Sequence, residues 1–167
     1  MNSGFNDLFK TACNIKSTYI NQDKKKFNSL PDFYKSGLYL YEMTKNIRKQ
    51  SFFLKKCAFE NLKKLGTSQI KDNNYEDAHY TFSKSLAIFK YITSDNPKWK
   101  TDGGIKDEEL TYHQDFGADN QEKKEIYSMM ISSLLNISLC SLYTENFIEV
   151  RQACEEVLKL DNKVIKA

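Results

Sequence analysis

One segment of this chain occurs twice, first around Leu62 and again around Leu134, and internal repetition of this kind restricts the possible folds more than any single motif does. Each copy has apolar residues at helical spacing, a small residue near the middle, a polar turn and a second amphipathic stretch. Each copy therefore predicts a helical hairpin. The predicted packing residues are Leu62, Leu65, Gly66, Tyr75, Ala78 and Phe82 in the first copy, and Leu134, Ile137, Ser138, Phe147, Val150 and Cys154 in the second.

Small residues in the first copy indicate where its two helices approach each other. Gly66 and Ala78 lie on either side of the polar turn Asn73-Asn74. Antiparallel helices pack closely where a small side chain on one accepts a ridge from the other. Ser138 and Val150 take the equivalent places in the second copy, which predicts the same contact there.

This pattern resembles the tetratricopeptide repeat, whose units stack as helix pairs into a solenoid with a concave peptide-binding face. The resemblance covers about residues 59–92 and 127–167. The first copy departs from the family in having Ser85 where alanine is usual, and neither copy ends in the usual proline. The fold class that this resemblance implies is all-α, with tetratricopeptide-type hairpins stacked as a short solenoid.

Composition agrees with a helical protein and argues against several functions. Charged residues make up 28% of the 167 residues and alternate with apolar ones at helical spacing, while only six glycines and two prolines interrupt them. No strand is needed. The net charge of +3 comes from scattered lysines, so nucleic-acid binding is not expected. Neither a signal peptide nor a membrane span is expected.

The four cysteines have neither metal-ligand nor disulfide-framework spacing, which indicates reduced cysteines and a cytoplasmic protein. A weakly amphipathic start with Phe5, Leu8 and Phe9 leaves organelle import as the alternative.

The chain divides into four predicted regions. Residues 1–54 form helices that cap or flank the solenoid. As an alternative, residues 33–50 cross its concave groove or dock on a partner. Residues 55–94 form the first hairpin, whose second helix is expected to run on through Ile92. Residues 95–124 form a polar, acidic insert, and residues 125–167 form the second hairpin.

Two short runs suggest a narrower resemblance. Asn96-Pro97-Lys98-Trp99 ends the first hairpin, and Leu134-Leu135-Asn136 lies early in the second. Together they resemble the tetratricopeptide region of immunophilin-type co-chaperones, in particular those like the aryl hydrocarbon receptor-interacting protein. The region before the first hairpin is too short for the isomerase-like domain of those proteins, so the resemblance implies no prolyl isomerase activity.

The same resemblance implies a peptide clamp. In the chaperone-binding members, ammonium, guanidinium and amide donors grip the acidic C-terminal tail of a heat-shock protein 90/70-type chaperone. Lys63 matches the first clamp lysine, Thr67 stands where the first clamp asparagine is expected, and Asn136 matches the second asparagine. The remaining clamp positions belong to a third repeat beyond Ala167, so the expected clamp is incomplete. In the alternative, purely structural interpretation, Lys63 belongs to a solvated helix face and Asn136 forms a hydrogen bond with a neighbouring helix.

These features favour a protein-interaction module that binds an extended peptide or a partner helix in its groove. The alternative is a structural subunit of a larger assembly, held by its helix faces and the insert and without peptide-tail binding. An open C-terminal edge of the solenoid would suit a dimer or a larger complex. No enzyme is expected, and no cofactor or metal, because His79 and His113 lack metal-ligand spacing and no nucleotide or hydrolase motif is present.

Overall fold

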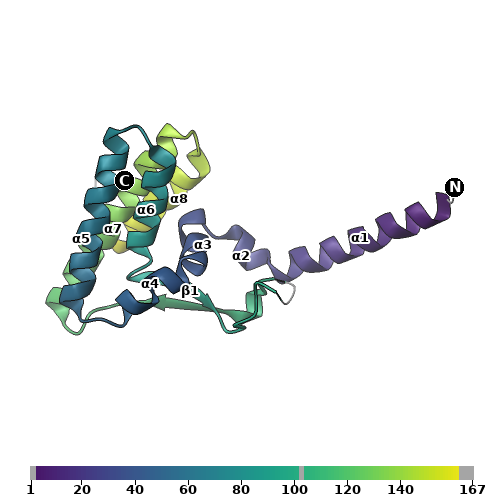
Figure 1. Cartoon of the computed structure of the whole chain (residues 1–167), viewed down its shortest axis with the longest axis horizontal. Helices are drawn as coiled ribbons and strands as arrows, with labels where there is room; N and C mark the ends of the chain where they lie inside the picture. Colours follow the sequence, from purple (N-terminus) through teal and green to yellow (C-terminus); the bar gives the residue numbers. More distant parts are fainter. Residues whose placement is uncertain (1–2, 102–103, 162–167) are drawn as a thin grey trace. The chain divides into compact units, whose positions relative to one another are not determined.

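Helices make up most of the computed structural model, which describes residues 3–101 and 104–161 (Figure 1). The predicted regions also include residues 1–2, 102–103 and 162–167, which lie outside the described residues. The helices are α1 (Ser3–Asp23), α2 (Lys25–Ser29), α3 (Asp32–Tyr39), α4 (Tyr41–Arg48), α5 (Phe52–Lys71), α6 (Tyr75–Leu86), α7 (Asn120–Tyr143) and α8 (Phe147–Leu160), with a 3-10 turn η1 (Asp107–Glu109). The strands are β1 (Lys90–Ser94) and β2 (Leu110–Gln114).

The chain forms two units, and each is described by itself. Unit 1 comprises residues 1–30 and 94–111, and unit 2 comprises residues 31–93 and 112–167. In unit 1, the Asp107 carboxylate accepts hydrogen bonds from the backbone N–H groups of Lys26 and Phe27, at 2.6 and 2.8 Å. This carboxylate ties α2 to the turn η1.

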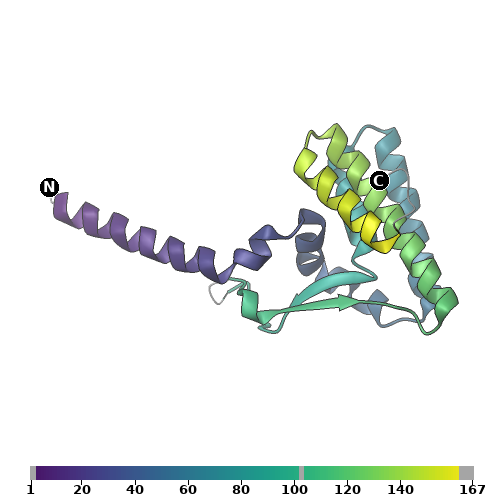
Figure 2. The same ribbon diagram turned by 180° about the vertical axis from the view of Figure 1, so that it is seen from behind.

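Unit 2 contains both predicted hairpins, formed by α5 with α6 and by α7 with α8. Helix α6 packs against α5 and α7, and α7 packs against α8, while α3 lies against α6 and α4 against α5. Figure 2 shows α8 on the outer side of α7. The core is apolar and joins all of these elements. Its largest fully buried side chains are Phe33, Phe59, Phe82, Phe89, Leu40, Leu86, Ile88, Ile92, Ile126, Met130, Leu134 and Ile137.

The turn inside each hairpin shows the repeat in atomic detail. Asn73 and Glu145, at equivalent places in the two copies, are the non-glycine residues with positive φ among the described residues, and both have φ of 59°. In both turns the following residue donates its N–H to the carbonyl five positions back, at 2.8 Å. This is the hydrogen-bond pattern of a Schellman helix end.

The second helix of each hairpin starts with the same N-cap. The side chain of Asn74 accepts a hydrogen bond from the backbone of Asp77, and Asn146 does the same for Glu149. An asparagine here satisfies one of the N–H groups that a helix start leaves unpaired. The two turns thus confirm the predicted register, in which Asn74 of the first copy corresponds to Asn146 of the second.

The contact between small and large residues is also repeated. A Cβ atom added at Gly66 would lie 2.6 Å from Cζ of Phe82, so the Phe82 ring already occupies that space. At the equivalent positions, Ser138 Oγ lies 3.5 Å from Cys154 Sγ. The smaller residue, Gly66, therefore faces the larger partner, Phe82, and the larger residue, Ser138, faces the smaller partner, Cys154. The sequence indicates Ala78 as the residue opposite Gly66, whereas in the structure the Phe82 ring takes that place.

Two predicted packing residues are exposed instead. Leu65 is 51% exposed and Phe147 is 64% exposed. The Tyr75 ring, equivalent to Phe147, stacks on Tyr143 of the second hairpin with ring centroids 4.3 Å apart. Phe147 is exposed because the described residues contain no further hairpin to supply such a ring.

The expectation of an all-α chain is wrong for the segment after the first hairpin. Helix α6 ends at Leu86, and residues 90–94 form strand β1, which pairs with β2. Tyr91-Ile92-Thr93 consists of aromatic and β-branched residues, which are enriched in strands. Only Ile92 in this strand is fully buried. Much of the predicted insert is therefore regular structure, and α7 begins at Asn120.

Helix α7 is mostly apolar after its polar and charged first six residues. Among the described residues it alone is long and apolar enough to cross a membrane by length and composition, with a mean hydropathy of 1.4 over 18 residues. The central helix of a water-soluble protein meets the same criteria, and α7 packs between α6 and α8. Since 44% of that window is already buried in the protein, this finding is weak evidence for a membrane span.

Gly66→Leu should lower the free energy of unfolding by about 1–3 kcal/mol, because the new side chain would overlap the buried Phe82 ring. Urea unfolding followed by circular dichroism measures the effect. Lys64→Leu, on the exposed side of the same helix, is the matched control and should change stability little. Equal effects of the two changes would contradict the packing described.

Glu145→Gly should raise the free energy of unfolding by about 1 kcal/mol, because glycine adopts positive φ without steric cost. Asn73→Gly should gain less, since asparagine tolerates this conformation better than glutamate does. Thermal unfolding of both variants measures the two gains in stability. A larger gain for Asn73→Gly than for Glu145→Gly would contradict this prediction.

Candidate functional site

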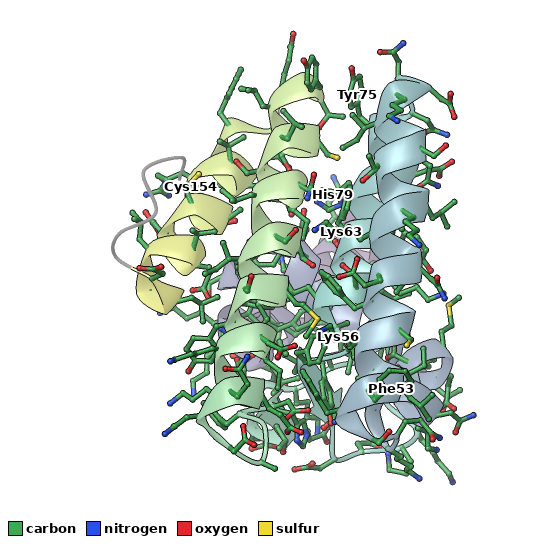
Figure 3. The ribbon with its side chains drawn as sticks, turned by 90° about the vertical axis from the view of Figure 1, so that its left-hand side faces the viewer. Phe53, Lys56, Lys63, Tyr75, His79 and Cys154 are labelled. Atoms are coloured by element: carbon green, nitrogen blue, oxygen red, sulfur yellow. The ribbon has the colours of Figure 1, made fainter. Side chains whose placement is uncertain are left out.

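The candidate site is the side of the bundle where α5 and α7 lie next to each other. Lys56 on α5 and Glu125 on α7 form an ion pair with Nζ and Oε2 at 2.7 Å, so these two side chains mark the facing sides of the helices. Figure 3 looks onto this side, with Lys56 and Lys63 between the two ribbons. The pair spans from one hairpin to the next and fixes the lower end of the site.

Helical spacing places the predicted clamp residues on these facing sides. Lys63 lies two turns after Lys56, and Thr67 one turn further, so all three share one face of α5. Asn136 lies about three turns after Glu125 and shares its face of α7. The structure therefore brings Lys63 and Thr67 to the side of α5 that faces α7, and Asn136 to the side of α7 that faces α5.

The three side chains differ in the donors they offer. The Lys63 side chain is half-buried and lines a hollow, and its ammonium makes no hydrogen bond or ion pair within the described part of the chain, so its three N–H donors remain for a ligand. Asn136 donates one amide hydrogen to the carbonyl of Ser132 at 2.7 Å. Thr67 donates its hydroxyl hydrogen to the carbonyl of Lys63 at 2.8 Å. Lys63 and the remaining Asn136 amide hydrogen are thus available to a ligand, while the Thr67 hydroxyl can only accept.

A shallow, positively charged hollow lies beside this face. It has a volume of about 320 Å³ and is lined by α5 alone. Three lysines and one carboxylate contribute to it, which gives it an excess of positive charge. The lining residues are Glu60, Lys63, Lys64, Thr67, Ser68 and Lys71.

The ion pair at the lower end of the site changes the pKa of both partners. The hydrogen bond to Glu125 raises the pKa of Lys56, and the hydrogen bond from Lys56, with a second from Gln121, lowers the pKa of Glu125. Both groups therefore stay charged at neutral pH. Sequence reasoning missed this pair, because 69 residues separate its members and neither belongs to a motif.

A second hollow, of about 500 Å³, lies near the start of α5 within unit 2. At its wall the Arg48 guanidinium lies 3.5 Å from the centre of the Tyr91 ring, which stacks on His113. Lys55 pairs with Asp115 at 2.6 Å. Partial burial would raise the pKa of Asp115, but hydrogen bonds from Lys55 and from the backbone of Gly117 hold it below its ordinary value.

The charged side chains of this second hollow each have a partner within the protein. The Arg48 Nε also donates to the carbonyl of Ala87 at 2.9 Å, and His113 Nε2 lies 2.8 Å from the Thr93 hydroxyl. These contacts join α4, β1 and β2. The second hollow is therefore the weaker candidate, because its polar side chains already serve as links between these elements.

The described residues offer no cluster of metal-binding side chains. No three His, Cys, Asp or Glu side chains among them could hold a metal ion together. His79 Nε2 lies 3.0 Å from Glu149 Oε2, an ion-pair distance, although the two atoms are not aligned for a hydrogen bond. His79 lies on α6 and Glu149 on α8, so this contact belongs to the packing between the two hairpins.

The Glu156 carboxylate has the most strongly shifted pKa of the acidic groups. Partial burial raises this pKa, but hydrogen bonds from Lys159, Lys90 and Tyr34 outweigh the burial and lower it to about 2. Lys90 and Lys159 approach the carboxylate at 2.8 and 2.6 Å. Burial and the neighbouring carboxylate raise the pKa of Tyr34. Shifted pKa values often mark active sites, but these partners all bond to Glu156 and tie α8 to α3 and β1, which is a structural role.

Comparison with known proteins gives one distant likeness. Over 106 residues the chain is 29% identical to the peptidyl-prolyl cis-trans isomerase D of Kluyveromyces lactis. The match covers 63% of this chain and 23% of that protein, so the chain spans less than a quarter of its relative's length. By its name the relative is an enzyme, but the likeness is distant and partial. No protein family matches the sequence, and no solved structure matches it significantly.

Glu156→Gln should lower the free energy of unfolding at pH 7 by about 1–3 kcal/mol. The folded-state pKa of about 2 lies below the ordinary value for glutamate, so the carboxylate stabilises the fold above about pH 4.3, and this contribution is lost as the pH falls toward 2. The difference between variant and wild type should therefore shrink at pH 3. Urea unfolding at both pH values measures it.

Glu155→Gln is the matched control, because that side chain is 54% exposed on the same helix. A pH-independent loss in the Glu156 variant, or an equal loss in the control, would contradict the assigned role.

Proposed function

We propose that this chain is a protein-interaction module that holds an extended acidic peptide, ending in a free carboxylate, against the α5/α7 face. The observation that carries the proposal is the placement of Lys63 and Asn136 on facing sides of two adjacent helices, with donors available on both. A carboxylate bound there would accept charge-assisted hydrogen bonds from the ammonium and the amide. The excess positive charge of the neighbouring hollow favours an acidic peptide.

The geometry suits an extended ligand. Lys63 and the Lys56–Glu125 pair lie two turns apart along α5, a separation of about 10 Å. A peptide lying along the face can therefore place its carboxylate at Lys63 while its other residues follow α5. Thr67 would pack against the peptide and could only accept a hydrogen bond from it, because its hydroxyl hydrogen is already donated to the Lys63 carbonyl.

The distant likeness to a peptidyl-prolyl isomerase supports a chaperone-associated role, and the tail of a heat-shock protein 90/70-type chaperone has the required acidic end. We infer a non-enzymatic, cytoplasmic adaptor without cofactor, metal, nucleic-acid partner or membrane span. Because the relative is an enzyme, a prolyl isomerase assay on a standard peptide is the direct test of the non-enzymatic role. Turnover above the uncatalysed rate would overturn that part of the proposal.

The second candidate function is that of a structural subunit in a larger assembly. Exposed apolar side chains on the second hairpin favour it, since Phe147 is 64% and Ile148 67% exposed on α8. Such a subunit would bind through helix faces and would not require a peptide carboxylate. The two functions therefore differ in their response to a free acidic peptide.

A titration with a peptide ending in Glu-Glu-Val-Asp tests the adaptor function, with the same peptide amidated at its C-terminus as the ligand control. We expect binding by the free acid only. Lys63→Ala and Asn136→Ala should each weaken it by about 1–3 kcal/mol, the usual cost of losing a charge-assisted hydrogen bond. Calorimetry or fluorescence anisotropy measures the affinity.

Lys84→Ala on α6 is the matched control, because it removes the same charge away from the α5/α7 face. It should change the affinity little. Equal binding of the amidated peptide, or an unchanged affinity in both site variants, would contradict the clamp and favour the structural subunit.

A further inference from the structure

The repeat makes it possible to compare each face of the first hairpin with the same face of the second. One stripe of α7 is buried, and its Ser133 hydroxyl lies 2.7 Å from the Ser85 hydroxyl of α6, so the stripe faces the preceding hairpin. The equivalent stripe of α5, one repeat earlier, is exposed. The α7 stripe consists of Ile126, Met129, Ser133, Ile137 and Cys140, and the α5 stripe of Leu54, Cys57, Asn61, Leu65 and Ser68.

The α5 stripe is apolar enough to be an interface. Leu54 is 48% exposed and Leu65 is 51% exposed, and both are aligned with isoleucines that are fully buried in α7. The five residues span one narrow side of the helix. This side differs from the one that carries Lys56 and Lys63, so covering it leaves those two lysines open, although Ser68 and Lys71 of the charged hollow lie at its border.

A matching stripe on α8 is exposed at the other end of the stack. It consists of Phe147, Arg151, Glu155 and Leu158, equivalent to Tyr75, His79, Ser83 and Leu86 of α6. The second hairpin covers the α6 stripe. The Tyr75 ring stacks on Tyr143, and His79 lies 3.0 Å from Glu149. In α8, by contrast, Phe147 is 64% and Leu158 is 46% exposed.

We propose that copies of this chain associate head to tail, with the α5–α6 hairpin of one copy docking on the α8 stripe of another. The contact would use the stripe positions that already join the two hairpins within a chain, while Val157, the equivalent of Ser85, is buried within its own chain and stays outside it. Both surfaces exist on every copy and lie at opposite ends of the hairpin stack, so each copy can bind two others. Such heterologous contacts form open chains of subunits unless their rotation closes a ring.

The residue pairs that this docking creates are complementary. Lys71 is equivalent to Tyr143, so it would lie against the Phe147 ring of the neighbouring copy, a cation–π contact in place of the stacked tyrosines. Asp77 is equivalent to Glu149, so it would approach Arg151, a full ion pair in place of the histidine–carboxylate contact. Asp77 and Arg151 are both exposed within the single chain. Complementary charge at both positions favours a second copy as the occupant.

Sedimentation of the full chain over a wide range of concentration tests the proposal. The wild-type chain should form dimers and larger species as its concentration rises. Arg151→Glu and Asp77→Arg should each weaken association by about tenfold or more, because each places like charges across the contact. An equimolar mixture of the two variants should recover association, since each variant then meets an opposite charge on the other.

Ile148→Glu is the matched control on α8. Ile148 is 67% exposed, and its equivalent, Glu76, is also exposed, so it lies outside the stripe and the change should have no effect. Asp77 also accepts a hydrogen bond from the Asn74 side chain near the helix start, so circular dichroism should confirm that its variant folds. If it does not fold, Phe147→Ala replaces it and should weaken association.

Three results would overturn the proposal. One is a wild-type chain that stays monomeric at every concentration, which would leave the stripes to another protein. Another is a failure of the mixed variants to recover association, which would indicate a symmetric contact. The third is dissociation by Ile148→Glu, which would place the interface on a different side of α8.

Discussion

Helix α7 is the element on which the rest of unit 2 depends, because it is packed from both sides. It lies against α6 of the first hairpin and α8 of its own, and the serine pair between Ser85 and Ser133 is buried where α6 meets α7. A buried hydroxyl pair of this kind has to be satisfied, so it fixes the register of one helix on the other as well as their contact. That register sets α5 and α7 next to each other and thereby creates the candidate site.

The repeat was predictable from the sequence because its determinants are local. Each hairpin contains its own turn residues and N-cap, and the first also contains the glycine that faces an aromatic ring. The turn and the N-cap recur in the second copy at a constant offset. The positive φ of Asn73 and Glu145 places the two turns where they were predicted, and the Phe82 ring against Gly66 shows why a small residue is needed there. The sequence predicts that Gly66 has to be small, but it does not predict that Phe82 is the residue packed against it.

The parts that sequence reasoning missed depend on partners distant in the chain. Lys90-Tyr91-Ile92-Thr93 could continue a helix or form a strand, and only pairing with β2, beyond the intervening turn η1, decides between them. The Glu156 carboxylate is held by side chains from α3 and β1, which no local pattern connects with α8. Phe147 matched the repeat in sequence, but its burial requires a neighbour that the described residues do not supply. For the candidate site, the sequence indicated the clamp residues, whereas the Lys56–Glu125 pair at its end became visible only with α5 and α7 in place.

The proposed peptide site and the proposed contact between copies use different sides of the same helices. Lys63 and Asn136 face the gap between α5 and α7, whereas the exposed stripes of α5 and α8 lie at the two ends of the stack. The peptide site and the contact between copies have the same origin. In a stack of hairpins, each hairpin has one face open to a ligand and two faces that pack on neighbouring hairpins. Lys63 and Asn136 therefore stay open to a peptide when copies associate, while Ser68 and Lys71 are shared between the charged hollow and the contact.

The most direct test of the account is to map where an acidic peptide binds on the isotopically labelled chain by nuclear magnetic resonance. We predict that peptide-induced shifts concentrate along Lys56–Thr67 of α5 and Glu125–Asn136 of α7, and that the Lys63 ammonium and Asn136 amide signals shift most. Shifts concentrated on α8 or in unit 1, or no shifts at saturating peptide, would contradict the claim that the α5/α7 face is the functional surface.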